Sequence, residues 1–92
     1  MQKENEELKL AKENDRGVRA EILLKDELLQ EAFTTLKENY KDEIIKTDIG
    51  DNEHRLNLLV HYKTLEKIED HLKEIVITGK LANEQLKSLK KF

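Results

Sequence analysis

The sequence predicts an all-α fold, and three observations carry this prediction. Apolar residues recur at spacings of three, four and seven over two long stretches, which places them on one side of a 3.6-residue helix. The residues between them are rich in Glu, Lys, Leu and Gln, which favour helix, and the chain contains no proline. The sustained alternation of apolar and polar residues that strands require is missing. We expect two long helices joined by a short turn, packed as an antiparallel helical hairpin.

The first long helix is expected over about residues 18–46. Its apolar stripe consists of residues that share one face: Val18, Ile22, Leu29, Phe33, Leu36, Tyr40 and Ile44. Residues 47–52 then concentrate turn formers. Gly50 can take a left-handed conformation, and Asp51 or Asn52 can cap the next helix by accepting a hydrogen bond from a free backbone N–H.

The second long helix is expected over about residues 52–78, ended by Gly79 in the usual position after a helix. A short C-terminal helix follows, supported by Leu81, Ala82, Leu86 and Leu89. The predicted hairpin core sets five residues of the first helix against six of the second: Ile22, Leu29, Phe33, Leu36 and Tyr40 against Leu58, Tyr62, Leu65, Ile68, Leu72 and Ile75.

Residues 1–16 are expected to form a charged helical extension or arm, and residues 17–92 the hairpin with its short C-terminal helix. The extension holds few internal apolar residues among many charged ones, namely Leu8, Leu10 and Ala11. These three are the candidate partner-binding residues, because an arm with little to bury in its own chain can become ordered against another protein. Gly17 offers a permissive joint, so the chain either bends there or continues as one helix.

Composition excludes several classes of protein. The 92 residues carry a net charge of −3, which lacks the basic surplus that neutralises phosphates, so nucleic acid is not an expected partner. The absence of cysteine removes disulfides and thiolate zinc sites. No apolar run is long enough for a membrane span or a secretory leader.

Catalytic and metal-binding patterns are also weak. His54, His61 and His71 are never four residues apart, the spacing that lets two imidazoles share an ion. Carboxylates spaced i,i+4, such as Glu27 with Glu31 and Glu38 with Asp42, are typical of solvated helix faces. Ser88 is the single serine and lacks a glycine-rich turn around it. Lysines gather near the C-terminus, where they suit the helix dipole: Lys80, Lys87, Lys90 and Lys91. We expect no enzyme, no cofactor, no metal and no small-molecule substrate.

Two strings carry a resemblance to a known group. The first is Arg16-Gly17-Val18-Arg19-Ala20-Glu21-Ile22-Leu23-Leu24 followed by Leu28-Leu29-Gln30-Glu31-Ala32-Phe33. The second runs from His54-Arg55-Leu56 through Leu65-Glu66-Lys67-Ile68 to Leu72 and Gly79-Lys80-Leu81-Ala82. Together they resemble a group of short uncharacterised helical proteins of tailed bacteriophages and prophages, over about residues 16–86. The resemblance implies a phage context and no catalytic residues, and it does not cover the first fifteen residues.

The expected function is that of a non-enzymatic phage protein working through helix-mediated protein–protein contacts, as an accessory component of the virion or its assembly. The alternative is a soluble phage regulator that binds and inhibits a host protein. Both readings expect a protein partner or self-association, and a location in the virion or in the cytoplasm of the infected bacterial host. The apolar stripes support both, because they exceed what two helices can hide from water.

Overall fold

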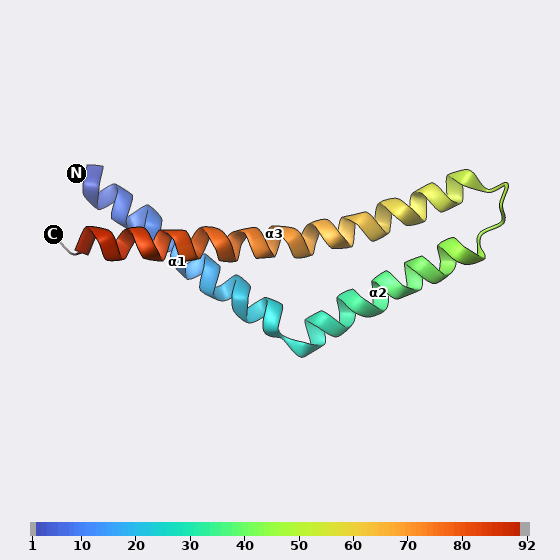
Figure 1. Cartoon of the computed structure of the whole chain (residues 1–92), viewed down its shortest axis with the longest axis horizontal. Coiled ribbons are helices and arrows are strands. Elements are labelled where there is room, and N and C mark those ends of the chain that lie inside the picture. The colour runs from blue at the N-terminus through green and yellow to red at the C-terminus, as the bar shows by residue number, and fades with distance from the viewer. Residues whose placement is uncertain (1, 91–92) are drawn as a thin grey trace. The chain divides into compact units, whose positions relative to one another are not determined.

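The computed structural model describes residues 2–90, which are all-helical, with three helices and no strand. Helix α1 spans Gln2–Lys25, α2 spans Glu27–Lys46 and α3 spans Asn52–Lys90 (Figure 1). The described residues divide into two compact units. Unit 1 contains residues 2–24 and 71–90, and unit 2 contains residues 25–70, so α3 contributes to both units. The predicted all-α class is confirmed.

The first predicted helix, over residues 18–46, is wrong in its boundaries because the chain breaks at Asp26. Asp26 has an extended backbone (φ −67°, ψ 119°), and its carboxylate accepts a hydrogen bond from the Leu29 N–H at 2.9 Å. A side chain that caps the following helix in this way competes with continuing the preceding one. The joint considered at Gly17 is not used, since α1 is continuous through that residue.

The loop of residues 47–51 is held by local hydrogen bonds, as the turn-forming composition predicted. The carboxylate of Asp51 accepts from the His54 N–H at 3.2 Å, which confirms the predicted cap. The Asp51 N–H donates to the Asp48 carbonyl at 2.9 Å, and Thr47 Oγ1 donates to the Glu43 carbonyl at 2.6 Å. Gly50 does not take the left-handed conformation considered for it, since no described glycine has a positive φ.

The predicted stop at Gly79 and the separate short C-terminal helix are also wrong. Helix α3 runs without interruption through Gly79 to Lys90, a length of 39 residues. A glycine inside a helix lowers the stability of that helix by about 1 kcal/mol relative to alanine. The structural reason for accepting this cost is a close contact between two helices in unit 1.

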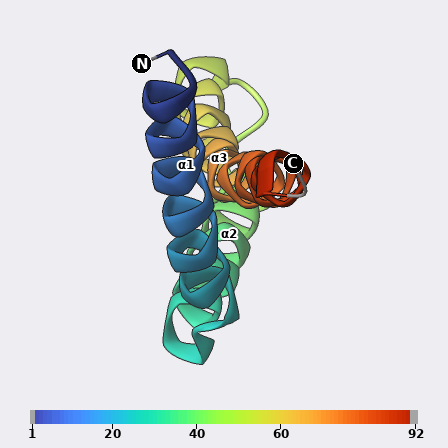
Figure 2. The same cartoon turned by 90° about the vertical axis from the view of Figure 1, so that its left-hand side faces the viewer.

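In unit 1, α1 crosses the C-terminal half of α3 (Figures 1 and 2), and a pair of glycines lies at the contact. A Cβ atom built on Gly17 would lie 2.7 Å from the Gly79 Cα, and one built on Gly79 would lie 2.7 Å from the Gly17 Cα. Two alanines and one leucine complete the buried set around this crossing: Leu10, Ala20 and Ala82. Small residues at both sides of the crossing therefore let the two backbones approach.

In unit 2, α2 and residues 52–70 of α3 bury one large apolar side chain each, Phe33 and Leu58. Tyr40 stacks on His61 with ring centroids 5.5 Å apart, and Lys41 Nζ lies 5.5 Å from the centre of the Tyr62 ring. These two contacts link α2 to α3 within the unit.

The predicted hairpin core is confirmed only for some of its members. Phe33 and Leu58 are buried. Three predicted members are exposed instead, namely Ile22, Leu36 and Ile68, and the other six are half-buried. The predicted core fails because it treats the first helix as unbroken, whereas the break at Asp26 puts Ile22 and Phe33 on different helices and in different units.

The predicted division between residues 16 and 17 does not coincide with a boundary in the structure. Residues 2–16 are the first part of α1 and belong to unit 1 with residues 71–90. The boundary between the units along α1 falls after Leu24, two residues before the break at Asp26. Within residues 2–90, none of the helices combines the length and the apolar character needed to cross a bilayer.

Candidate partner-binding surface

The three residues predicted to bind a partner, Leu8, Leu10 and Ala11, lie in different environments. Leu10 is 6 % exposed, whereas Leu8 is 56 % exposed and Ala11 is also exposed. Successive residues of a helix point about 100° apart, which puts Leu10 on the same side of α1 as Gly17 and Ala20. That side packs on α3. Leu10 therefore belongs to the core of unit 1, and only Leu8 and Ala11 remain accessible to another protein.

Two further apolar side chains of α1 point to the same side as Leu8 and Ala11. Val18 follows Ala11 by seven residues and Ile22 follows Val18 by four, so the four side chains lie within about 80° around the helix axis. Val18 is 51 % exposed and Ile22 is 64 % exposed. We call these four residues the α1 stripe.

Sequence reasoning placed Val18 and Ile22 on the apolar stripe of the first predicted helix, and Ile22 also in the hairpin core, and therefore missed both as surface residues. A signal for their true position was present, because their helical phase matches that of Leu8 and Ala11. What the sequence could not show is that the opposite side of α1, built from Leu10, Gly17 and Ala20, is the side that α3 covers.

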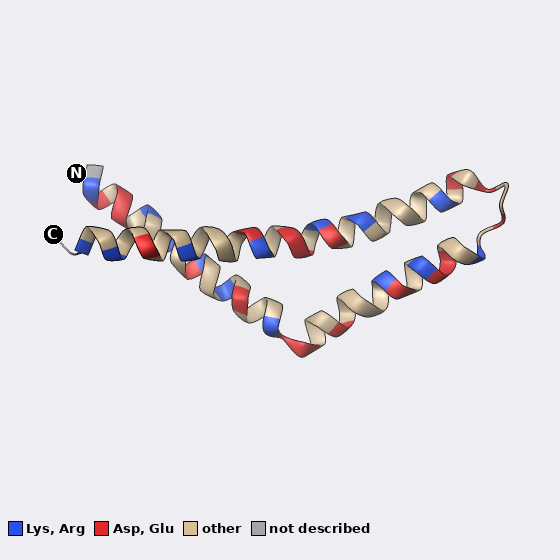
Figure 3. Ribbon diagram, in the orientation of Figure 1, with Lys and Arg blue, Asp and Glu red and all other residues tan. Residues whose placement is uncertain are grey.

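The charged residues around the α1 stripe form weak pairs that a partner can rearrange. Arg19 and Asp15 approach to 3.9 Å, and both side chains are at least 70 % exposed. An exposed pair of this kind contributes about 0–1 kcal/mol. Figure 3 shows charges of both signs interspersed along all three helices, without a block of one sign on α1. Apolar contact rather than charge is therefore the main chemistry that the α1 stripe offers.

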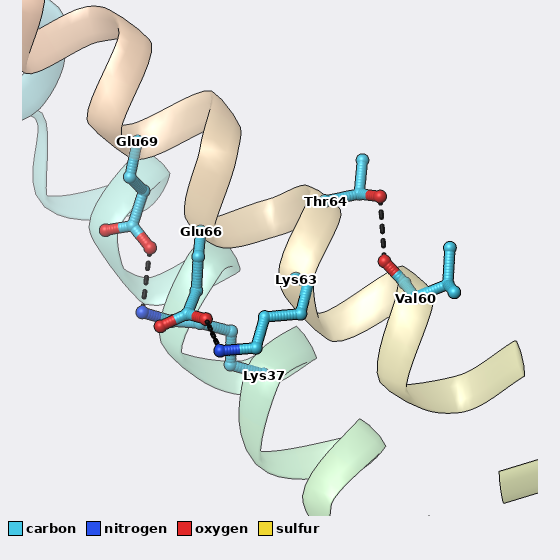
Figure 4. A network of polar contacts seen from close by, with 6 residues as sticks. All are labelled: Lys37, Val60, Lys63, Thr64, Glu66 and Glu69. Atoms are coloured by element: carbon cyan, nitrogen blue, oxygen red, sulfur yellow. Dashed lines mark hydrogen bonds and ion pairs between the residues drawn. The ribbon is translucent and has the colours of Figure 1, made fainter. Parts of the chain in front are cut away.

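The shortest ion pair described in unit 2 joins Lys37 to Glu69 (Figure 4). Lys37 Nζ lies 2.7 Å from Glu69 Oε1, with 27 % and 13 % of the two side chains exposed. On the neighbouring turn, Lys63 Nζ lies 3.2 Å from Glu66 Oε1. The Lys37–Glu69 pair connects α2 to α3 across the unit, whereas Lys63 and Glu66 both lie on α3.

The electrostatics of this pair favour a structural role. The hydrogen bond to Glu69 raises the pKa of Lys37, against the lowering effect of burial, and the charges of Glu69, Tyr62 and Glu66 raise the pKa further. A lysine held in its protonated form is a poor nucleophile and a poor base at neutral pH. The pair therefore holds α2 against α3 within unit 2.

The three histidines are dispersed in the structure. His61 stacks on Tyr40, His71 Nδ1 lies 3.7 Å from the Glu74 carboxylate, and His54 lies in the first turn of α3. Among residues 2–90, no three His, Asp or Glu side chains are grouped so that they could hold a metal ion.

The remaining candidate groups are exposed to solvent. The i,i+4 carboxylates Glu27, Glu31, Glu38 and Asp42 are all exposed, and so is Ser88. Within residues 2–90, none of these carboxylates forms an ion pair.

The depressions on each unit are small or wholly polar. One in unit 1 encloses about 210 Å³ and has mixed walls: Glu13, Arg16, His71, Glu74, Ile75 and Thr78. One at the loop of unit 2 encloses about 320 Å³ and has only polar residues in its walls: Glu43, Lys46, Thr47, Asp48, Asp51 and His54. Small-molecule sites in proteins usually enclose 300–1,000 Å³ and are mostly apolar, so neither depression has the features of such a site.

No protein-family model, no curated protein and no solved structure matches this chain. The α1 stripe, with three aliphatic side chains that are each at least half exposed, is a candidate surface of unit 1 for contact with another protein.

Proposed function

We propose that this protein is a non-enzymatic accessory component of a tailed-phage particle or of its assembly, and that it acts through helix-mediated contacts with other proteins. The observation that carries the proposal is the α1 stripe, in which Leu8, Val18 and Ile22 each leave half or more of their surface exposed. The phage context comes from the resemblance over residues 16–86, and it implies a location in the virion or in the infected host's cytoplasm.

The α1 stripe sets limits on the partner that would bind it. It spans fifteen residues from Leu8 to Ile22, and these two ends lie about 21 Å apart along the helix. Burying a large aliphatic side chain completely contributes about 1.5–3 kcal/mol, and these three are about half exposed, so they offer about 2–5 kcal/mol together. Association itself costs at least about 4 kcal/mol in lost freedom of motion. We infer a partner that runs along α1 as a helix or groove and adds contacts on both flanks of the stripe.

Mass spectrometry of purified particles tests this function. We expect the protein to be present at a fixed copy number relative to the major structural proteins. The double variant Leu8→Ser/Ile22→Ser should lose at least 80 % of that incorporation, roughly the effect of removing 1–2 kcal/mol of binding free energy. Its helix content should remain that of the wild type, because both side chains are exposed.

A double variant of two equally exposed residues outside the stripe, Leu28→Ser/Leu56→Ser, is the matched control and should be incorporated normally. Absence of the wild-type protein from purified particles would overturn the virion role. Recovery of one host protein bound through the α1 stripe would favour the host-directed regulator instead.

A further inference from the structure

A second group of exposed apolar residues lies at the loop of unit 2. Ile49 is 93 % exposed, and Ile45 in the last turn of α2 is 80 % exposed. Arg55 holds the loop that carries Ile49, since its Nη2 donates to the Asp48 carbonyl at 2.8 Å and to the Thr47 carbonyl at 3.4 Å. An apolar side chain on a pre-ordered loop loses little entropy on binding, which suits it to insert into a surface.

The segment around Ile49 is strongly acidic. Residues 42–54, which we call the loop end, contain five Asp or Glu and one Lys, a net charge of −4, whereas the whole chain carries −3. Within the described residues, no Lys or Arg forms an ion pair with Asp48, Asp51 or Glu53. The loop end therefore presents an isoleucine surrounded by unneutralised carboxylates.

The complementary surface lies on the C-terminal half of α3, in unit 1. Lys73, Lys80 and Lys87 follow one another at intervals of seven, so they line one side of the helix. Beside them lie Ile77 and Leu81, which are 59 % and 61 % exposed. In the part of the chain that the structure describes, none of the three lysines has a carboxylate within ion-pair distance. We call these five residues the lysine face.

We propose that the loop end of one copy of this protein docks on the lysine face of a second copy. Ile49 would pack against Ile77 and Leu81, and the free carboxylates around it would pair with Lys73, Lys80 and Lys87. The charge pattern of both segments is visible in Figure 3, with acidic residues at the loop between α2 and α3 and lysines along the last turns of α3. This proposal names one partner for the proposed function but does not depend on the phage context.

The two surfaces differ, so the contact is heterologous. Each added copy leaves one loop end and one lysine face free, and the assembly grows until it closes as a ring or continues as a filament. The affinity of this contact must fall as the salt concentration rises, because charges at an exposed interface are screened over about 8 Å at physiological ionic strength.

Sedimentation velocity of the purified full-length protein tests the proposal. In about 20 mM salt, the average mass should rise with concentration from 10.8 kDa to multiples of it, and in about 0.5 M salt the mass should return to that of the monomer. A monomeric mass at every concentration in low salt overturns the proposal.

Charge-reversed variants identify the two surfaces. The loop variant Glu43→Lys/Asp48→Lys and the face variant Lys80→Glu/Lys87→Glu should each remain monomeric. An equimolar mixture should associate again, with the two variants alternating, because the intact loop end fits the intact lysine face and the reversed loop end is complementary in charge to the reversed face. Self-association by either variant alone at wild-type strength overturns the proposal, and so does the absence of complexes in the mixture when circular dichroism shows both variants folded.

The exposed isoleucine provides a test that does not depend on charge reversal. Ile49→Ser should raise the dissociation constant of self-association about tenfold. The helix content should not change, because the Ile49 side chain is 93 % exposed. Ile22→Ser removes an exposed isoleucine from the α1 stripe and is the matched control, which should associate like the wild type. The reverse result, a loss with Ile22→Ser and none with Ile49→Ser, would place self-association on the α1 stripe and overturn the proposal.

Discussion

Gly17 and Gly79 bring α1 and α3 together in unit 1. A Cβ on Gly79 would lie 2.7 Å from the Gly17 Cα and 3.0 Å from the Glu13 carbonyl oxygen. Both neighbours are backbone atoms, so they cannot move aside as the end of a flexible side chain could. Local preference and tertiary packing therefore oppose each other at this residue, because alanine favours helix but does not fit the contact.

Gly79→Ala tests which effect is larger. Overpacking costs about 1–3 kcal/mol and the gain in helix propensity is about 1 kcal/mol, so we expect a net loss of about 1 kcal/mol in the free energy of unfolding. Urea titration of the wild type and the variant measures this loss in the free energy of unfolding. Gly50→Ala is the control and should be neutral, since a Cβ there meets nothing within 4 Å. If Gly79→Ala instead stabilises the protein, α1 and α3 can move apart at the crossing at little cost.

The pair of Lys37 with Glu69 predicts a pH dependence of stability. The pKa of Lys37 in the folded state is raised above the ordinary value of 10.5, mainly by the hydrogen bond to Glu69. The protonated lysine therefore stabilises the folded protein fully at pH values below 10.5, and this contribution is lost as the pH rises through the folded-state pKa.

Lys37→Met should lower the free energy of unfolding by about 1–3 kcal/mol at neutral pH, because the substitution leaves the carboxylate of Glu69 without its cation. Unfolding titrations of the wild type and the variant should show this difference shrinking above about pH 10.5. Lys67→Met, an exposed lysine on α3, is the control and should change stability by less than about 0.5 kcal/mol. A difference that stays constant through pH 11 would argue that the pair does not act through charge.

At the scale of elements, the cap at Asp26 determines where α1 ends and α2 begins. Asp26→Ala removes the hydrogen bond to the Leu29 N–H and should cost about 1 kcal/mol, the usual value for an N-cap. Chemical denaturation measures this loss. Asp15→Ala is the control, since Asp15 forms only a solvated pair at 3.9 Å and should contribute less than half as much. Equal losses in the two variants would mean that the cap is not what holds this break.

The sequence predicted that these helices exist, because periodic apolar spacing is a local property. It did not predict the break at Asp26 or the continuity through Gly79. An aspartate within a periodic run looks the same whether it caps a helix or faces solvent, and only its backbone conformation separates the two cases. In its local sequence, Gly79 looks like the end of a helix. In the structure it lies inside α3 because it contacts Gly17, and these two residues lie 62 positions apart in the sequence.

The candidate surface could be predicted only in part for a similar reason. The sequence proposed Leu8, Leu10 and Ala11 as partner-binding residues. Leu8 and Ala11 are exposed, whereas Leu10 is buried, and nothing in the sequence indicated this because the helix that covers Leu10 is more than sixty residues away in the chain. The number of faces that a helix buries depends on its neighbours. Sequence periodicity gives the phase of each apolar residue but not which phase is covered.

At the scale of the whole molecule, each unit has a small core of its own. Leu10, Ala20 and Ala82 are the buried apolar residues described in unit 1, and Phe33 and Leu58 are those described in unit 2. Because α3 runs through both units, loss of a core contact in one unit can either destabilise that unit alone or destabilise both units. Cooperative opening of one unit at a time is a common behaviour of proteins with separate cores.

Hydrogen exchange followed by mass spectrometry distinguishes these two outcomes with two matched substitutions. Leu10→Ala and Leu58→Ala each shorten a leucine that is about 5–6 % exposed, and each should remove about 2–4 kcal/mol from the stability of its unit. Leu10→Ala should accelerate exchange in residues 7–24 and 71–89, with little change in residues 28–66, and Leu58→Ala should do the reverse. If either substitution accelerates exchange equally along the whole of α3, the two cores open as one cooperative structure, because the shared helix then transmits the loss from one unit to the other.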